Sequence, residues 1–215
     1  MKGLGFPEVD RDGSHAVRVE PGKRIRVGVT IRALGGIVYP NLAYVVRINR
    51  IEELWEDYIA ELGLLNERGF YPTFMIGLLE AWPEVAARAD YNEKVHSLSL
   101  ELNEEGVQKF YTLFEYILKE KMFPLGEKLE DVAELDRIIN RGPVEMATWL
   151  IQGKEWFLRR LIIARLANNP DLDKIYERDL AELQAREKTG EAFFQHYPDV
   201  MEKVFNKLKN VEPWV

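Results

Sequence analysis

The 215-residue chain contains no cysteine, which excludes disulfides, thiolate metal sites and a cysteine nucleophile. Its hydrophobic fraction of 47% and charged fraction of 30% are typical of a globular protein that folds without covalent cross-links. The net charge is -7, yet the first fifty residues carry nine basic and four acidic side chains, which leaves 20 basic and 32 acidic ones in the remainder. Such an asymmetry is a clue to partners.

Neither the N-terminus nor the most apolar later run meets the physical requirements of a segment that targets a chain to a membrane. The N-terminus places acidic residues and Pro7 where a signal peptide needs an unbroken apolar core of about 7 to 15 residues. The later run 161–167 is interrupted by arginine and falls far short of the roughly 20 residues that cross a bilayer. We therefore expect a cytoplasmic protein without a membrane partner.

From Lys23 to Ala33 the sequence alternates apolar and polar side chains, which predicts a half-buried strand. Its inner face carries aliphatic residues, Ile25, Val27, Val29, Ile31 and Ala33. Gly35-Gly36 suits a tight turn and the alternation resumes from Leu42 to Ile48, so the two segments predict a hairpin, preceded by a shorter strand at 16–19. Because Pro40 cannot donate to a ladder, we expect the second strand to begin at an edge or after a bulge.

Helical spacing of apolar residues dominates the rest of the chain. An Asn49 and Glu52 capping box predicts a helix over about 50–66, and Asn103 caps a second helix whose buried stripe is Val107, Phe110, Phe114 and Ile117. Residues 123–126 would break that helix. Further elements are expected as strands at 70–79 and 96–102, a short helix led by Pro83, and helices at 127–140, 143–168, 170–188 and 198–208.

Strands gathered early and helices gathered late predict an α+β fold. We expect a single domain over 1–215, strand-rich over 1–102 and helical over 103–210, with a loose C-terminal tail at 211–215. A small antiparallel sheet, made of the N-terminal hairpin and one or two later strands, would be covered on one face by about five to six helices. The helix at 143–168, apolar around much of its circumference, would be the hub of the core.

The basic outer face of the hairpin is the first candidate site. Its arginines are Arg24, Arg26, Arg32 and Arg47. Guanidinium groups side by side on a sheet can hold a phosphate, a carboxylate or an acidic partner through bidentate hydrogen bonds. The competing interpretation is that carboxylates of the same chain neutralise these arginines at the surface.

The tryptophans divide into core and surface candidates. Trp55, Trp149 and Trp156 fall on apolar helical stripes, which is core spacing. Trp82, before a proline, and Trp214, in the tail, are expected to be exposed, and an exposed aromatic can anchor an interface with a partner.

Motifs for catalysis, cofactors and metals are not found in the sequence. The acidic groups 52–57 and 130–136 fit solvated helix faces, and Glu93 with His96 matches only half of a di-iron ligand pattern. The three serines lie in no nucleophile elbow, and neither a phosphate-binding loop nor a dinucleotide fingerprint is present. We therefore expect no metal and no cofactor, and an enzyme only if its site is assembled from distant residues.

The segment SLSLELNEEGVQKFYTLFEYILKEKMFPLGEKLEDVAELDRIINRG, with Phe123-Pro124-Leu125 between two helices, resembles small bacterial α+β proteins of uncharacterised families, some of them linked to immunity against polymorphic toxins. The resemblance covers residues 23–185 in the order of the elements. It implies a non-catalytic inhibitor that binds a partner protein, and it assigns a role to no individual residue.

Three hypotheses follow from these patterns. The first is a non-catalytic protein-binding module, in its specific form an immunity-type inhibitor whose acidic body steers toward a basic partner. The second is a small-molecule or nucleotide-binding protein, or an enzyme, that holds an anionic group with the strand arginines. The third is a structural homodimer formed through an edge strand or Trp214. Nucleic acid is disfavoured as a partner because the net charge is negative.

Overall fold

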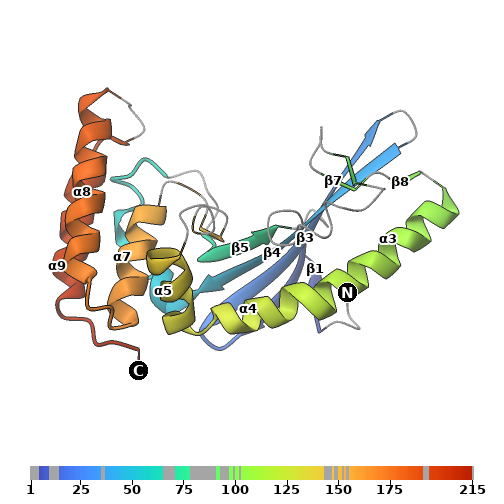
Figure 1. Ribbon diagram of the computed structural model, residues 1–215, viewed down its shortest axis with the longest axis horizontal. Coiled ribbons are helices and arrows are strands. Elements are labelled where there is room, and N and C mark those ends of the chain that lie inside the picture. The colour runs from blue at the N-terminus through green and yellow to red at the C-terminus, as the bar shows by residue number, and fades with distance from the viewer. Residues whose placement is uncertain are drawn as a thin grey trace. The chain divides into compact units, whose positions relative to one another are not determined.

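The computed structural model describes residues 5–9, 15–34, 37–64, 71–77, 91–92, 97–98, 100–101, 103–142, 147, 150–151, 153, 155–190 and 194–214. The fold is α+β with an antiparallel sheet and a helix-rich C-terminal half, as the sequence predicts (Figure 1). The chain divides into two compact units, which are described separately below. Unit 1 comprises residues 1–46 and 74–128, and unit 2 comprises residues 47–73 and 129–215.

The sheet of unit 1 has β3 and β4, the predicted hairpin, at its centre. Its strands are β1 (Glu8–Val9), β2 (His15–Glu20), β3 (Lys23–Leu34), β4 (Ile37–Ile48), β5 (Phe74–Gly77) and β8 (Leu100–Glu101). The order is β1-β2-β3-β4-β5, with β8 also paired to β4. A separate two-stranded ladder joins β6 (Tyr91–Asn92) to β7 (Ser97–Leu98). The predicted strand at 70–79 begins only at Phe74, whereas the four described residues of the predicted strand at 96–102 all lie in strands, β7 and β8.

The first half of the predicted inner face of β3 is buried. Ile25 and Val27 have at most 2% of their surface exposed, and Val29 is half-buried. The opposite face is less open than predicted, because Arg26 pairs with Val17 of β2 and Val17 is also buried. The long stems of arginine side chains can cover such an apolar neighbour while their charged ends reach water.

Pro40 lies inside β4 rather than at its start. The strand pairs with β8 at Ile37 and Val38, and with β5 at residues 43–46. Pro40 falls in the interval between these two pairings, where one neighbouring strand gives way to the other. A residue without a backbone N–H is tolerated where a ladder changes partner, so β4 continues through it.

The predicted helix break at residues 123–126 is wrong. Helix α3 (Glu104–Ile117) passes through a π-helical segment (Leu118–Met122) into α4 (Phe123–Leu129) without interruption (Figure 1). In a regular helix the ring of Pro124 would collide with the carbonyl of residue 120, and its missing N–H would leave that carbonyl without a donor. The wider π turn just before Pro124 relieves this conflict, so the proline is retained inside a continuous helix.

Aromatic contacts fix α4 on the inner side of the sheet. The ring of Phe123 lies 5.7 Å from that of Tyr44 in β4 and 5.9 Å from that of Phe6. Gly126 permits this close approach, because a Cβ added there would stand 2.4 Å from the Tyr44 ring. This part of unit 1 therefore shows a helix packed on the sheet, as predicted for the fold class.

The predicted N-cap of α3 is confirmed, and a glycine follows it for a packing reason. The Asn103 side chain accepts a hydrogen bond of 2.8 Å from the backbone N–H of Gly106. A Cβ added at Gly106 would stand 2.0 Å from the backbone oxygen of Glu101 in β8. The first turn of α3 therefore needs a residue without a side chain.

We expect Gly106→Ala to destabilise the protein by about 1–3 kcal/mol, because the added methyl group must push the helix away from the strand. The same change at an ordinary helix position would stabilise it by up to about 1 kcal/mol. Urea unfolding of this variant beside Thr112→Ala, at an exposed position of the same helix, measures the difference. A Gly106→Ala protein as stable as the parent would contradict the close packing.

Unit 2 consists mainly of helices. They are α1 (Asn49–Glu52), a 3-10 turn (Glu56–Tyr58), α5 (Val132–Arg141), α7 (Trp156–Leu166), α8 (Leu172–Lys188) and α9 (Tyr197–Leu208). Helix α7 is buried on nearly all sides, as expected for the hub, and packs against α5, α8 and α9. None of the helices in the described ranges is both long and apolar enough to span a membrane.

Two predicted helices of unit 2 are shorter than expected. The predicted helix at 50–66 is reduced to α1 and the 3-10 turn. The residues between them form turns with backbone hydrogen bonds between residues three apart, such as Leu54 N to Ile51 O at 3.4 Å. The predicted capping box is wrong, because the Asn49 side chain does not cap the helix and Glu52 points into the core. The predicted helix at 143–168 is interrupted: Ala147 and Leu150 are helical, Gly153 adopts a φ of +94°, a value that favours glycine, and α7 begins at Trp156.

The C-terminal tail, expected to be loose, is held by hydrogen bonds over residues 211–214. Trp214 donates its backbone N–H to the carbonyl of Leu166 at 2.7 Å. Arg165 and Arg50 donate to the carbonyls of Val211 and Glu212, respectively. The predicted helix led by Pro83 lies outside the described residues.

Candidate functional site

Among the described residues, the four strand arginines do not line up as one row on the sheet. Arg24 and Arg26 lie on the same face of β3, opposite Val19 and Val17 of β2, and both are half-buried. Both also interact with other groups of the chain. The side chain of Arg32 lies outside the described residues. Arg24 and Arg26 remain candidates for an anion or an acidic partner, a prediction that the geometry alone does not test.

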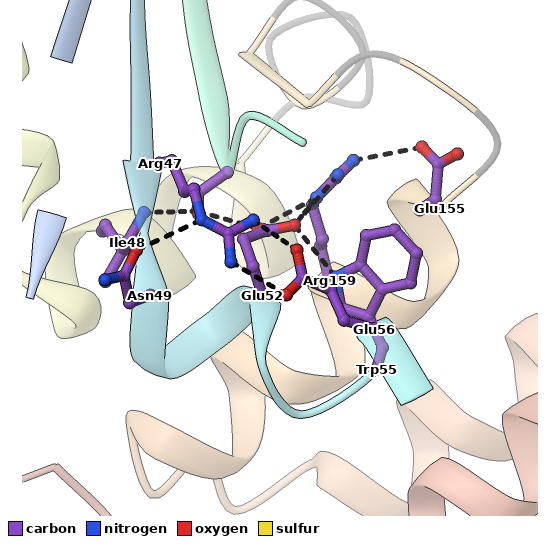
Figure 2. Close-up of polar contacts among 9 residues, drawn as sticks. Arg47, Ile48, Asn49, Glu52, Trp55, Glu56, Glu155 and Arg159 are labelled. Atoms are coloured by element: carbon purple, nitrogen blue, oxygen red, sulfur yellow. Dashed lines mark hydrogen bonds and ion pairs between the residues drawn. The ribbon is translucent and has the colours of Figure 1, made fainter. Parts of the chain in front are cut away.

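Arg47 is engaged by a carboxylate of its own unit. Its two terminal nitrogens face the two oxygens of Glu56, with Nη2 to Oε2 at 2.9 Å, and its Nε donates to Asn49 Oδ1 at 3.1 Å (Figure 2). The pair is largely shielded, since the Arg47 side chain is only 11% exposed. A bidentate pair of this kind uses up the fork that would otherwise bind an external anion. For Arg47, the structure therefore favours neutralisation within the chain.

A buried polar cluster lies beside this pair. The Glu52 side chain, fully buried, accepts hydrogen bonds from Arg159 Nε and Nη2 at 3.0–3.1 Å, from Trp55 Nε1 at 2.9 Å and from Thr73 Oγ1 at 2.8 Å (Figure 2). Arg159, itself 1% exposed, also reaches Glu155 at 3.3 Å. These contacts connect the segment 47–73 to the hub helix α7.

The electrostatics of this cluster indicate a structural role. Burial alone would lower the pKa of Arg159, but the charge and hydrogen bonds of Glu52, with a contribution from Glu155, outweigh that effect and raise it. Both oxygens of Glu52 receive hydrogen bonds. An ion pair that is buried this deeply is not accessible to a substrate. Its role is to connect two parts of the chain, the segment 47–73 and helix α7. The expectation that Glu52 belongs to a solvated helix face is wrong.

A second buried cluster joins α5 to the end of α7. Asp136, predicted on a solvated face, is 1% exposed. Its carboxylate accepts hydrogen bonds of 2.8 Å from the side-chain amides of both Asn140 and Asn169. Asn140 in turn accepts from Arg160 Nε at 3.1 Å. The acidic group 130–136 thus contains a structural anchor rather than a cation site.

Arg160 extends this cluster to α8 through Asp179. The Arg160 Nη1 to Asp179 Oδ1 distance is 3.5 Å, and Arg178 Nε approaches the same oxygen at 2.8 Å. Burial raises the pKa of Asp179, although the opposite charge of Arg160 and the hydrogen bond from Arg178 lower it. Burial likewise lowers the pKa of Arg160, although the negative charge of Asp179 acts to raise it. Desolvation therefore outweighs attraction in this weakly bonded pair.

Helix α3 presents apolar side chains to solvent. Among the described residues, five large hydrophobic side chains are exposed, and three of them, Val107, Tyr111 and Tyr116, lie on this one helix. Tyr111 is 61% exposed and Tyr116 52%. The ring of Phe110, 5.9 Å from Tyr111 and 5.4 Å from the buried Phe114, links the exposed part to the core. Aromatic residues held in this way are typical anchors of protein interfaces.

The expected buried stripe of α3 is therefore only partly right. Phe114 and Ile117 are buried, whereas Val107 is 45% exposed. Tyr111 and Tyr116 were not among the residues predicted as partner contacts. A signal was present, because apolar residues at 107, 110, 111, 113, 114, 116 and 117 cover more of the helix circumference than one buried face requires.

Of the two tryptophans proposed as partner contacts, only Trp214 is described. It is 41% exposed, and the Arg50 guanidinium carbon lies 5.2 Å from the centre of its ring. Such a cation–π contact orients the ring at the surface. Trp82 lies outside the described residues. Trp214 remains a candidate contact of unit 2.

The basic first fifty residues and the acidic remainder of the sequence do not correspond to a basic and an acidic unit. Unit 1 contains 13 basic and 14 acidic residues, and unit 2 contains 16 and 22. The basic hairpin is nearly balanced by acidic residues of the later segment 74–128 in its own unit. The contrast between a basic sheet and an acidic body is therefore weaker than the sequence halves suggest.

No group of three or more histidine, aspartate or glutamate side chains that could hold a metal ion occurs in the described part of the chain. Comparison with family models, with curated proteins and with solved structures finds no match to this chain. The function must therefore be argued from the surface of the molecule.

Proposed function

We propose that this chain is a non-catalytic protein-binding module whose contact surface is the exposed face of α3. The observation that carries the proposal is the concentration of exposed apolar side chains on this helix, where Val107 and Tyr111 stand one turn apart. Solvent-exposed apolar side chains gathered in one place are a feature of interaction sites, whereas scattered ones need no explanation.

The anchoring of Tyr111 supports this choice of surface. Its neighbour Phe110 is half-buried and contacts Phe114 in the core. The three aromatic side chains are therefore held in place from the buried side. A side chain that is already ordered loses little conformational entropy when a partner covers it. Exposed aromatic residues on a rigid helix therefore offer binding energy at low cost.

The specific form implied by the resemblance is an immunity-type inhibitor, which would bind a different protein. The anion-binding hypothesis has weaker support, because Arg47 is paired with Glu56 and only Arg24 and Arg26 lie together on described strand positions. We therefore place protein binding first.

The test compares two tyrosines of the same helix. Tyr111→Ser and Tyr116→Ser remove similar exposed rings, but positions 111 and 116 lie about 140° apart around the helix axis. We expect a tagged chain expressed in its native cell to retain a stoichiometric protein partner, counting a differently tagged second copy as a partner. Tyr111→Ser should reduce this retention at least about tenfold, as for an anchor residue, and Tyr116→Ser should not.

Circular dichroism melting of both variants checks that the fold is preserved. If the wild-type chain retains no stoichiometric partner, or if the two variants retain it equally, the exposed face of α3 is not the contact surface.

A further inference from the structure

The exposed side chains of α3 follow a charge pattern that is complementary to itself. Five exposed positions, Glu104, Gln108, Tyr111 and Glu115 of α3 and Lys119 of the π-helical segment that continues it, fall within roughly 80° of one another around the helix axis. Along this strip the first residue is acidic, the middle one is aromatic, and the C-terminal end carries acidic Glu115 followed by basic Lys119. Val107 borders the strip beside Tyr111. We call these five residues the α3 strip.

A second copy of the same strip fits when it runs in the opposite direction. With a two-fold axis between positions 111 and 112, Glu104 of one copy faces Lys119 of the other, and Gln108 faces Glu115. The two Tyr111 rings then meet at the axis. Each contact occurs twice, as a two-fold interface requires. The opposed macrodipoles of antiparallel helices also attract each other.

We infer that the α3 strip is the interface of an antiparallel homodimer, so that the partner bound by this surface is a second copy of the chain. The inference rests on the proposed function, and it names as the partner a second copy of the chain in place of the different protein that an immunity-type inhibitor would bind. The apolar part of the strip is small, with Val107 and Tyr111 as its centre, so the dimer is weak and forms at high concentration. The charged ends fix its direction and contribute less to its affinity.

Local contacts of the strip are compatible with this pairing. Lys119 Nζ lies 2.5 Å from Glu115 Oε1 within the same copy, and both side chains are about half exposed. Exposed pairs of this kind contribute little and rearrange readily. Lys119 can therefore also approach Glu104 of the second copy, which would form a small network across the interface.

Charge reversal tests the pairing without changing the aromatic centre. Glu104→Lys places like charges at both ends of the interface, and so does Lys119→Glu. In the heterodimer that forms in an equimolar mixture of the two variants, both contacts between positions 104 and 119 again join opposite charges. Sedimentation equilibrium of the full chain is measured between about 10 µM and 1 mM. Melting curves confirm that each variant is folded.

We expect the wild-type chain to shift from monomer toward dimer across this range. Each charge-reversal variant should dimerise at least about threefold more weakly, and the mixture should recover the wild-type constant. A wild-type chain that stays monomeric overturns the inference, as do single variants that dimerise like the wild type or a mixture that does not recover. The proposed function would then still be decided by whether Tyr111→Ser releases a different protein.

Discussion

Replacing Arg159 with methionine is expected to lower the free energy of unfolding by about 3–5 kcal/mol. The substitution keeps an unbranched apolar stem but leaves the Glu52 carboxylate buried at 0% exposure with its charged partner gone. The cation–π contact of Arg159 with the Trp55 ring, at 5.2 Å, is lost as well. Urea unfolding monitored by circular dichroism measures the change.

Two further variants separate this effect from a general loss of charge. Arg137→Met removes an arginine whose pair with Glu134 lies at the surface, and it should leave stability unchanged within error. Adding Glu52→Gln to Arg159→Met removes the stranded charge, so the double variant should regain part of the lost stability. An Arg159→Met protein as stable as Arg137→Met would show that the buried cluster does not hold unit 2 together.

The second large effect is expected at Asp136. Asp136→Ala removes the acceptor for the side-chain amide of Asn169, which then lacks a partner in the interior, whereas the half-buried Asn140 amide keeps its bond to the Arg160 carbonyl at 3.2 Å. Since a buried donor left unsatisfied costs about 1–3 kcal/mol, we expect a loss of about 1–3 kcal/mol in chemical denaturation. The helices that separate first should be α5 and α7, which this cluster connects.

Asp136→Asn is the matched comparison because it keeps one acceptor oxygen and nearly the same volume. It should cost less than half as much as the alanine variant. Equal losses in the two variants would mean that packing volume, and not the hydrogen bonds of the carboxylate, determines the stability of this region.

The elements that the sequence predicted best are those governed by local rules. The hairpin of β3 and β4 follows from period-two alternation and a glycine pair, and the Asn103 cap follows from side-chain chemistry at a helix start. Helices α8 and α9 are predicted by the helical spacing of their apolar residues and by the residues that start and end helices on either side. In each case neighbours within a few residues decide the structure.

The failures occur where distant residues decide. Glu52 has the spacing of a capping residue, yet Arg159, 107 positions away, draws it into the core. Pro124 has the signature of a helix end, yet the π segment before it and the packing of Phe123 on Tyr44 keep the helix continuous. The arginines within the apolar sequence of α7 were the available sign that carboxylates would be buried beside them.

The candidate site also differs from the predicted one, because tertiary contacts decide which side chains are paired and which are exposed. The sequence pointed to Arg47, which the structure pairs with Glu56, and it assigned Val107 to the core, where the structure leaves it exposed. Periodicity shows that a helix has an apolar face, but it does not show how far along the helix that face stays covered. The wide apolar surface of α3 was visible in the sequence, but which of its residues stay exposed is shown only by the folded chain.

Photo-crosslinking from α3 in the native cell tests whether this helix is the binding surface. A benzophenone amino acid replaces Tyr111 in one chain and Tyr116 in another, and the adducts are identified by mass spectrometry. The account predicts one dominant protein adduct from position 111, namely a second copy of this chain if the dimer forms, and only background from position 116. Equal labelling from the two positions, or no adduct from position 111, would contradict the assignment of α3 as the binding surface.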